Sequence, residues 1–183
     1  MNRIDAWFER VSFEQFEKDV IENMIDIFGH TINKDHIQDF YNNITLPRRA
    51  TKDSAGYDFF FPFPLRPLQA GAVMHIPTGI RCKIPEGWWL GLYPKSSLGI
   101  NYRVQMDDTI AVIDGDYYLC DKNEGHICVK LANNDRNKRL LKIDTGDSYC
   151  QGIFLPYGIL MDDNVTKIRK GGLGSTQARA EDI

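Results

Sequence analysis

Five short segments of this 183-residue chain carry the side chains that phosphate chemistry uses: carboxylates, a lysine, hydroxyls and glycine-rich turns. In chain order they are residues 53–58, 94–99, 112–117, 146–151 and 171–176. A carboxylate can orient and deprotonate a water, whereas lysine, hydroxyl and backbone N–H groups bind phosphate oxygens. Together the segments indicate a site that handles phosphate groups.

The third segment offers a candidate general base, Asp114. It follows the apolar residues Val112 and Ile113, so it should stand where a strand ends, and Gly115 then allows a turn. A carboxylate held there could take the proton of a water that attacks phosphorus. The same residues also fit a hairpin turn in which an aspartate accepts hydrogen bonds from backbone amides, so the segment alone leaves both interpretations open.

The second segment offers a candidate phosphate cradle: Lys95, Ser96 and Ser97, which follow an expected strand that begins at Trp88. One cation, two hydroxyls and adjacent backbone amides suit an anion. Either serine could instead be the N-cap of a short helix. Both interpretations can hold together, because a helix N-terminus favours anions.

The last segment could close over a phosphate group. Its glycines let backbone N–H groups approach oxygens, while Lys170, Ser175 and Thr176 supply charge and hydroxyls. Taken alone, residues 170–183 equally fit a Gly-rich, polar tail that is mobile without a ligand.

The composition fits one soluble domain with an appendage, at 43% hydrophobic and 26% charged residues. A net charge of −3 provides no global basic field, so we expect neither nucleic acid nor a membrane as partner. The chain starts without the apolar run of a signal peptide, and no stretch approaches the length of an apolar membrane span. None of the cysteines forms a C-x-x-C pair. We therefore expect a cytoplasmic protein with reduced thiols.

The elements that must position the five segments fall into two parts. Apolar residues at helical spacing predict one helix from Ser12 to Gly29 and a second over residues 34–41. From Leu46 onward, short apolar runs alternate with turn residues, which is typical of a β-sandwich or jelly roll. The expected strands include residues 73–76, 80–84, 88–92, 127–131 and 150–155. We thus expect a mainly β fold: a helical extension over residues 1–45, a β domain over 46–168 and a tail over 169–183.

In order and composition, the five segments resemble the five motifs of the homotrimeric dUTP diphosphatase (dUTPase) family. The resemblance runs from about Leu46 to Gln177 and implies a dUTPase-like β jelly roll, or β-clip, with three sites at the subunit junctions of a homotrimer. It implies hydrolysis of dUTP to dUMP and pyrophosphate. In that reaction Asp114 would act as the general base for a water that attacks the α-phosphorus.

The resemblance also assigns residues to the parts of the nucleotide. The phosphate groups and the closing tail would involve Lys95, Ser96, Ser97, Gln151, Lys170, Leu173, Gly174, Ser175 and Thr176. Tyr117 would lie under the deoxyribose, and the hairpin from Asp108 to Ile113 would select uracil. Asp58 would organise water around a Mg²⁺ ion that binds the triphosphate, so no dedicated protein cage is expected.

Four positions depart from the family pattern. Lys95 and Ser148 stand where the family usually has arginine, and lysine lacks the bidentate fork of arginine. Leu173 stands where the family has a phenylalanine, and it covers a base with less area and no π-face. Asp108 replaces an asparagine near the base; because a carboxylate only accepts hydrogen bonds, it could favour a cytosine amino group.

Two other functions remain open. The dCTP deaminases share this fold, but they would require a catalytic glutamate in the strand after the third motif and an arginine after the serine pair. Here Glu124 falls in an inserted loop, and residues 98–101 contain no arginine. A non-catalytic trimer that senses nucleotides is the other alternative, motivated by the altered second, fourth and fifth motifs.

Overall fold

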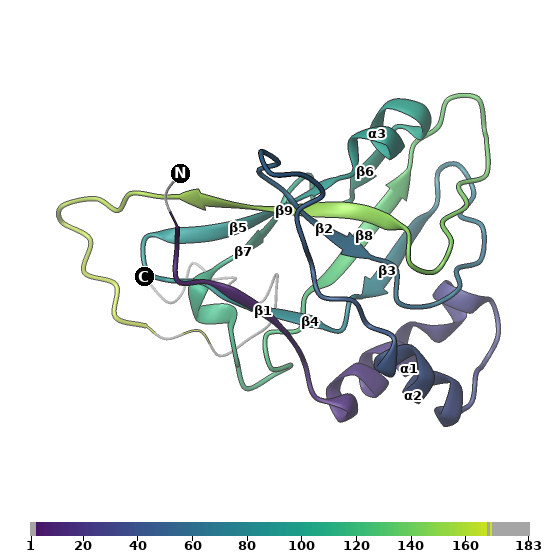
Figure 1. The fold of residues 1–183 in the computed structure, drawn as a ribbon, viewed down its shortest axis with the longest axis horizontal. Coiled ribbons are helices and arrows are strands. Elements are labelled where there is room, and N and C mark those ends of the chain that lie inside the picture. Colours follow the sequence, from purple (N-terminus) through teal and green to yellow (C-terminus); the bar gives the residue numbers. More distant parts are fainter. Residues whose placement is uncertain (1–2, 168, 170–183) are drawn as a thin grey trace, which may run out of the picture.

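The computed structural model describes residues 3–167 and Arg169 of the chain. Its described part consists mainly of short antiparallel strands, with two helices packed at one end (Figure 1). The helices are α1 (Phe13–Phe28), α2 (Lys34–Asn42) and α3 (Ser96–Tyr102), and a 3-10 turn, η1, spans Gly115–Tyr117. The strands are β1 (Trp7–Arg10), β2 (Tyr57–Phe60), β3 (Val73–Pro77), β4 (Ile80–Lys83), β5 (Trp88–Pro94), β6 (Val104–Met106), β7 (Ala111–Ile113), β8 (Cys128–Asn133) and β9 (Ser148–Pro156).

Three antiparallel sheets surround one core. The largest has the strand order β2-β9-β5-β7, the second has the order β3-β8-β6, and β1 pairs with β4. Fully buried residues from both larger sheets, among them Phe59, Leu90, Ile76 and Val129, belong to one hydrophobic cluster. The predicted mainly β fold with N-terminal helices is confirmed.

The sequence signals of α1 act as predicted. The Ser12 hydroxyl accepts a hydrogen bond from the Gln15 N–H at 3.1 Å, which satisfies one of the free amides of the first turn. Gly29 ends the helix in the left-handed region at φ 78°, which glycine adopts without a steric penalty. Phe16, Val20 and Ile27 form its buried face.

The N-terminal part is fastened to the β domain by side chains as well as by packing. Glu124 accepts hydrogen bonds from both the backbone N–H and the hydroxyl of Ser12, at 2.9 and 2.6 Å. The Arg81 guanidinium pairs with Glu124 at 2.9 Å and with Glu9 of β1 at 2.7 Å. The helices therefore have a fixed position on the domain.

Three strands escaped the sequence analysis, and one of them changes the description of the N-terminus. Residues 1–45 were expected to be helical, but β1 precedes α1 and pairs with β4, with Trp7 opposite Lys83. β2 and β6 are the other two. No helix in the described part of the chain is long and apolar enough to span a bilayer.

Candidate functional site

Residues from the first and fourth segments meet on one face of the largest sheet. Asp58 on β2 lies opposite Gln151 on β9, and Gln151 lies opposite Tyr93 on β5. Residues directly opposite in an antiparallel pair point to the same face. The three side chains therefore form a row across the sheet, and each is partly exposed. A Cβ at Gly56 would collide with the Gln151 carboxamide, so this glycine gives the glutamine room beside the turn.

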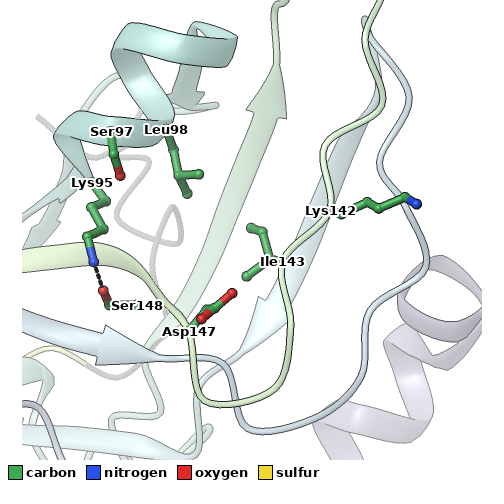
Figure 2. Close-up of a pocket in the computed structure, with 7 residues that line it drawn as sticks. All are labelled: Lys95, Ser97, Leu98, Lys142, Ile143, Asp147 and Ser148. Atoms are coloured by element: carbon green, nitrogen blue, oxygen red, sulfur yellow. Dashed lines mark hydrogen bonds between the residues drawn. The ribbon is translucent and has the colours of Figure 1, made fainter.

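The second and fourth segments together form a pocket of about 230 Å³ (Figure 2). Its lining residues are Lys95, Ser97, Leu98, Lys142, Ile143, Asp147 and Ser148. The Lys95 ammonium donates a hydrogen bond to the Ser148 hydroxyl, whereas the Lys142 side chain points away from the centre of the pocket. The pocket therefore combines the Lys95 ammonium and two hydroxyls, which suit a phosphate group, with the Asp147 carboxylate, which opposes an anion.

The helix after Lys95 begins differently from the prediction. Neither Ser96 nor Ser97 is the N-cap of α3; Lys95 occupies that position, and no side chain caps the helix. Ser96 and Ser97 are both exposed. The prediction of a serine cap is therefore wrong, and these hydroxyls are not committed to the helix start.

The candidate base Asp114 lies outside this pocket, between β7 and η1. Its carboxylate accepts a hydrogen bond from the Arg169 Nη2, and the Arg169 Nε donates to Asp116 at 2.8 Å. The Arg169 side chain is only 10% exposed, whereas that of Asp114 is 46% exposed. The carboxylate thus has one charged partner and remains accessible to a ligand.

The surroundings of Asp114 shift its acidity. Burial raises the pKa of Asp114, the Arg169 guanidinium opposes this rise, and the Asp116 carboxylate adds to it. The pKa of Asp114 lies above its ordinary value as a result. A carboxylate with a raised pKa is a stronger base once it is ionised.

The residues predicted to contact sugar and base have different environments. Tyr117 is 2% exposed, and its hydroxyl donates to the His126 carbonyl at 2.7 Å, so its ring contributes to the core of the single chain. Ile113 is also buried. Asp108 is exposed in the turn before β7, and that strand separates it from Asp114. Their contacts with a nucleotide remain predictions.

The candidate base and the phosphate pocket lie at opposite ends of β5. Leu90 pairs with Ile113, the residue before Asp114, whereas Lys95 follows Pro94 at the other end of the strand. From position 90 to position 95 an extended strand covers about 16 Å at roughly 3.3 Å per residue. Within one chain, the candidate base and the phosphate pocket are therefore well separated along the strand.

Some predicted residues lie outside the described part of the chain, and other residues were missed. The predicted residues outside the described part are Lys170, Leu173, Gly174, Ser175 and Thr176. The residues that the sequence analysis did not name as site residues are Arg169, Asp147 and Lys142. Arg169 could have been found as a cation directly before a glycine-rich segment. The sequence could not indicate that it pairs with Asp114 and Asp116.

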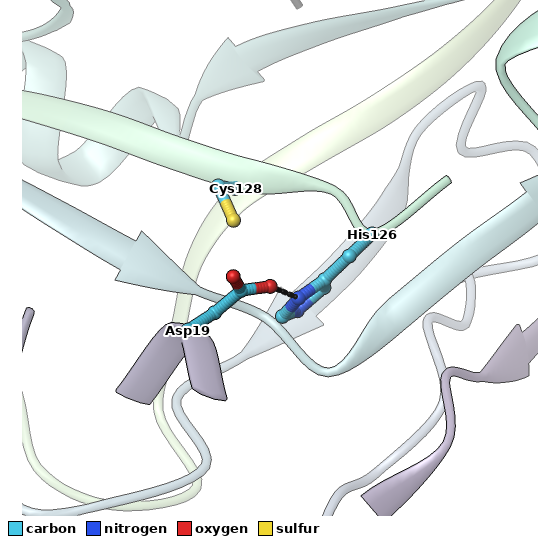
Figure 3. A group of neighbouring side chains, drawn as sticks. All are labelled: Asp19, His126 and Cys128. Atoms are coloured by element: carbon cyan, nitrogen blue, oxygen red, sulfur yellow. Dashed lines mark hydrogen bonds and ion pairs between the residues drawn. The ribbon is translucent and has the colours of Figure 1, made fainter. Parts of the chain in front are cut away.

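A second polar cluster joins α1 to the β domain (Figure 3). Asp19, His126 and Cys128 place ligand atoms within 4.8 Å of one another. The Gly79 N–H donates to His126 Nε2 at 2.7 Å, so the ring proton is on Nδ1 and is donated to Asp19 at 2.5 Å. A metal at Nδ1 would require a hydrogen on Nε2, facing the Gly79 N–H. The hydrogen bonds therefore indicate that this cluster connects α1 to the β domain and is not a metal site.

Comparisons with known proteins agree on one family. The dUTPase family profile matches residues 42–177. A deoxyuridine 5'-triphosphate nucleotidohydrolase from Lactococcus lactis is 34% identical over 137 residues, which cover 74% of this chain and 89% of the relative. One from Dictyoglomus turgidum is 32% identical over 161 residues, which cover 84% and 99%.

Solved structures give the same result for the fold. The crystal structure of a Streptococcus mutans dUTPase has a TM-score of 0.58 and 27% identity, covering 84% of this chain and 97% of that one. A mutant dUTPase from phage phi11 of S. aureus has a TM-score of 0.52 at 19% identity, covering 68% and 92%. That phage structure shows the coordination of a structural Mg(II) ion.

Proposed function

Because this chain belongs to the dUTPase family, we propose that it hydrolyses dUTP to dUMP and pyrophosphate. The observation that carries the proposal is the match over residues 42–177, which includes all five segments with candidate phosphate chemistry. The partly exposed carboxylate of Asp114 and the cationic pocket at Lys95 supply the two chemical functions that this reaction needs.

In the proposed mechanism Asp114 orients a water and takes its proton as the water attacks the α-phosphorus. The raised pKa of Asp114 supports this role, because proton transfer is more favourable to a stronger base. Arg169 pairs with both Asp114 and Asp116, and it would hold the carboxylate of the proposed base in place.

The pocket would hold the phosphate groups that leave as pyrophosphate. The Lys95 ammonium and the Ser97 hydroxyl line it. Ser96 lies between them at the start of α3, and Gln151 is on β9, which also carries Ser148 of the pocket. Cations and hydroxyls fixed in place stabilise the charge that develops on the leaving oxygens.

A Mg²⁺ ion fits the same end of the sheet. The Asp58 carboxylate is partly exposed, and it stands opposite Gln151, so it offers hard oxygen atoms to the hydration shell of an ion bound to the triphosphate. When bound, the ion would neutralise charge on the pyrophosphate group.

Base and sugar selection is the second half of the proposal. The backbone between Asp108 and Ile113 would read uracil, and Tyr117 would exclude a 2′-hydroxyl. Because the Tyr117 ring is covered in the single chain, this contact requires its edge to become accessible when the nucleotide binds. The tail with Lys170, Leu173 and Ser175 would cover the bound nucleotide.

The assembly proposed is a homotrimer in which neighbouring chains share each site. The distance along β5 between Asp114 and Lys95 supports sharing, because a base from one chain can meet the pocket of another. In a closed cyclic trimer, each of the three sites would receive its base from one chain and its phosphate pocket from a neighbouring chain.

The test is an assay of the purified protein with each deoxynucleoside triphosphate, scored for pyrophosphate and ammonia. We expect pyrophosphate from dUTP and little from dCTP, dTTP, dATP or dGTP. Ammonia from dCTP would indicate deamination, although Glu124 is already engaged by Ser12 and Arg81. Binding without either product would indicate a nucleotide sensor and would contradict the proposal.

A further inference from the structure

Ser148 has an unusual position in the largest sheet. On β9, Cys150 lies opposite Phe59 and Ser148 lies opposite Phe60, so a two-residue step on β9 matches a one-residue step on β2. The extra residue is Tyr149, and this irregularity is a β-bulge. Bulges re-aim the side chains beside them.

The bulge moves Ser148 to the face that carries the candidate site. In a regular strand Ser148 would share a face with Cys150, which is fully buried. Opposite Phe60 it instead shares the face of Asp58, because residues two apart on β2 point the same way. The hydroxyl then reaches the Lys95 ammonium in the pocket (Figure 2).

The pairing of Lys95 with a neutral hydroxyl preserves its charge. A serine accepts one of the three N–H groups of the ammonium and leaves two for a ligand. A carboxylate in that place would fix the ammonium equally well but would cancel its charge. Asp147 lines the same pocket, yet the hydrogen bond that its carboxylate accepts comes from the Asp144 N–H at 3.2 Å.

We propose that Ser148 is a positioning residue: it holds the Lys95 ammonium in the pocket, where the two remaining N–H groups bind a phosphoryl oxygen of the nucleotide. The inference rests on the proposed function for the identity of the ligand. Lysine has a flexible stem that must otherwise be immobilised when the ligand binds. The hydroxyl removes part of that cost beforehand and so increases affinity for the phosphate groups.

Ser148→Ala tests the proposal, with Ser148→Thr as the matched control that keeps the hydroxyl. We expect Ser148→Ala to raise KM for dUTP, and the Kd of inorganic pyrophosphate, roughly 3- to 10-fold, the cost of fixing one long side chain. The kcat should change by less than about twofold, because Asp114 does the chemistry elsewhere. Ser148→Thr should restore both constants.

A double-mutant cycle separates positioning from general damage. In a Lys95→Ala background, Ser148→Ala should have no further effect on the Kd of pyrophosphate. The proposal would be overturned if Ser148→Ala had an equal effect in both backgrounds, or if it left KM unchanged in the parent protein. It would also be overturned if the solution mass of Ser148→Ala showed a loss of assembly. If the parent protein released no pyrophosphate from dUTP, the proposed function would fail, while calorimetry with pyrophosphate would still decide the role of Ser148.

Discussion

At the scale of single residues, the proposed chemistry depends on Asp114. We expect Asp114→Asn to lower kcat for dUTP roughly 10²-fold or more while it preserves folding and nucleotide binding, because an amide cannot accept the proton. Steady-state kinetics and a binding titration measure the two properties. Asp116→Asn is the control, since Asp116 shares Arg169 with Asp114 and should retain most turnover. Parental turnover in Asp114→Asn would show that another group is the base.

The same carboxylate predicts a pH dependence. Asp114 must be ionised to act, and its pKa is raised, so kcat/KM should fall at a higher pH than an ordinary aspartate would give as the solution is acidified. Arg169 lowers this pKa, so Arg169→Met should move the acid limb to higher pH. Asp116 raises it, so Asp116→Asn should move the limb to lower pH. Shifts of the same sign in both variants would contradict the assignment.

Two buried tyrosines give opposite expectations for one substitution. The Tyr149 hydroxyl is buried without a hydrogen-bond partner in the described part of the chain, so Tyr149→Phe should raise the free energy of unfolding by about 1 kcal/mol. The Tyr117 hydroxyl donates to the His126 carbonyl and accepts from Asn123 at 2.8 Å, so Tyr117→Phe should lower it by about 1 kcal/mol. Urea unfolding at one protein concentration compares the free energies of unfolding of the two variants. A loss of stability in Tyr149→Phe would contradict the expectation for the unpaired hydroxyl.

At the scale of elements, the start of α1 links helix stability to domain docking. The Ser12 hydroxyl caps α1 and also donates to Glu124, so Ser12→Ala should lower the free energy of unfolding by about 1–2 kcal/mol. Ser96→Ala is the control, because α3 has no side-chain cap and little change is expected. Equal losses in the two variants, measured by urea unfolding, would argue against the cap.

The sequence predicted those helices and strands that are marked by local signals within their own residues. Apolar periodicity and the capping residues Ser12 and Gly29 are local signals, and they located α1 correctly. The strand β1 is only four residues long, and its partner β4 lies more than 70 positions away, so no local pattern marks it. Long-range pairing of this kind depends on the whole fold.

The site shows the same limit. Residue types named Lys95 as a candidate, the family resemblance added Asp58 and Gln151, and the strand register then placed the three at one end of the sheet. The register also depends on the bulge at Tyr149, which places Ser148 on the opposite face. No composition or spacing reveals a bulge, and the pairing of Ser148 with Lys95 was therefore not predictable.

At the scale of the whole molecule, the proposed sharing of each site between chains predicts complementation. Asp114→Asn and Lys95→Ala should each be nearly inactive. Mixed trimers of the two should regain activity at about one third of their sites, since one of the three junctions in each mixed ring pairs an intact base with an intact pocket. Co-expression with two affinity tags and sequential purification isolates the mixed assemblies. Mixed assemblies as inactive as either parent would indicate that each chain completes its own site.

If neighbouring chains share each site as proposed, the span of β5 between Asp114 and Lys95 would also make activity depend on protein concentration. Separate chains would carry these groups and yet catalyse nothing. Working centres would arise only through encounters between copies, so they would accumulate more steeply than the chains themselves as expression begins. Dilution would then silence the protein without unfolding it, and reconcentration would bring it back.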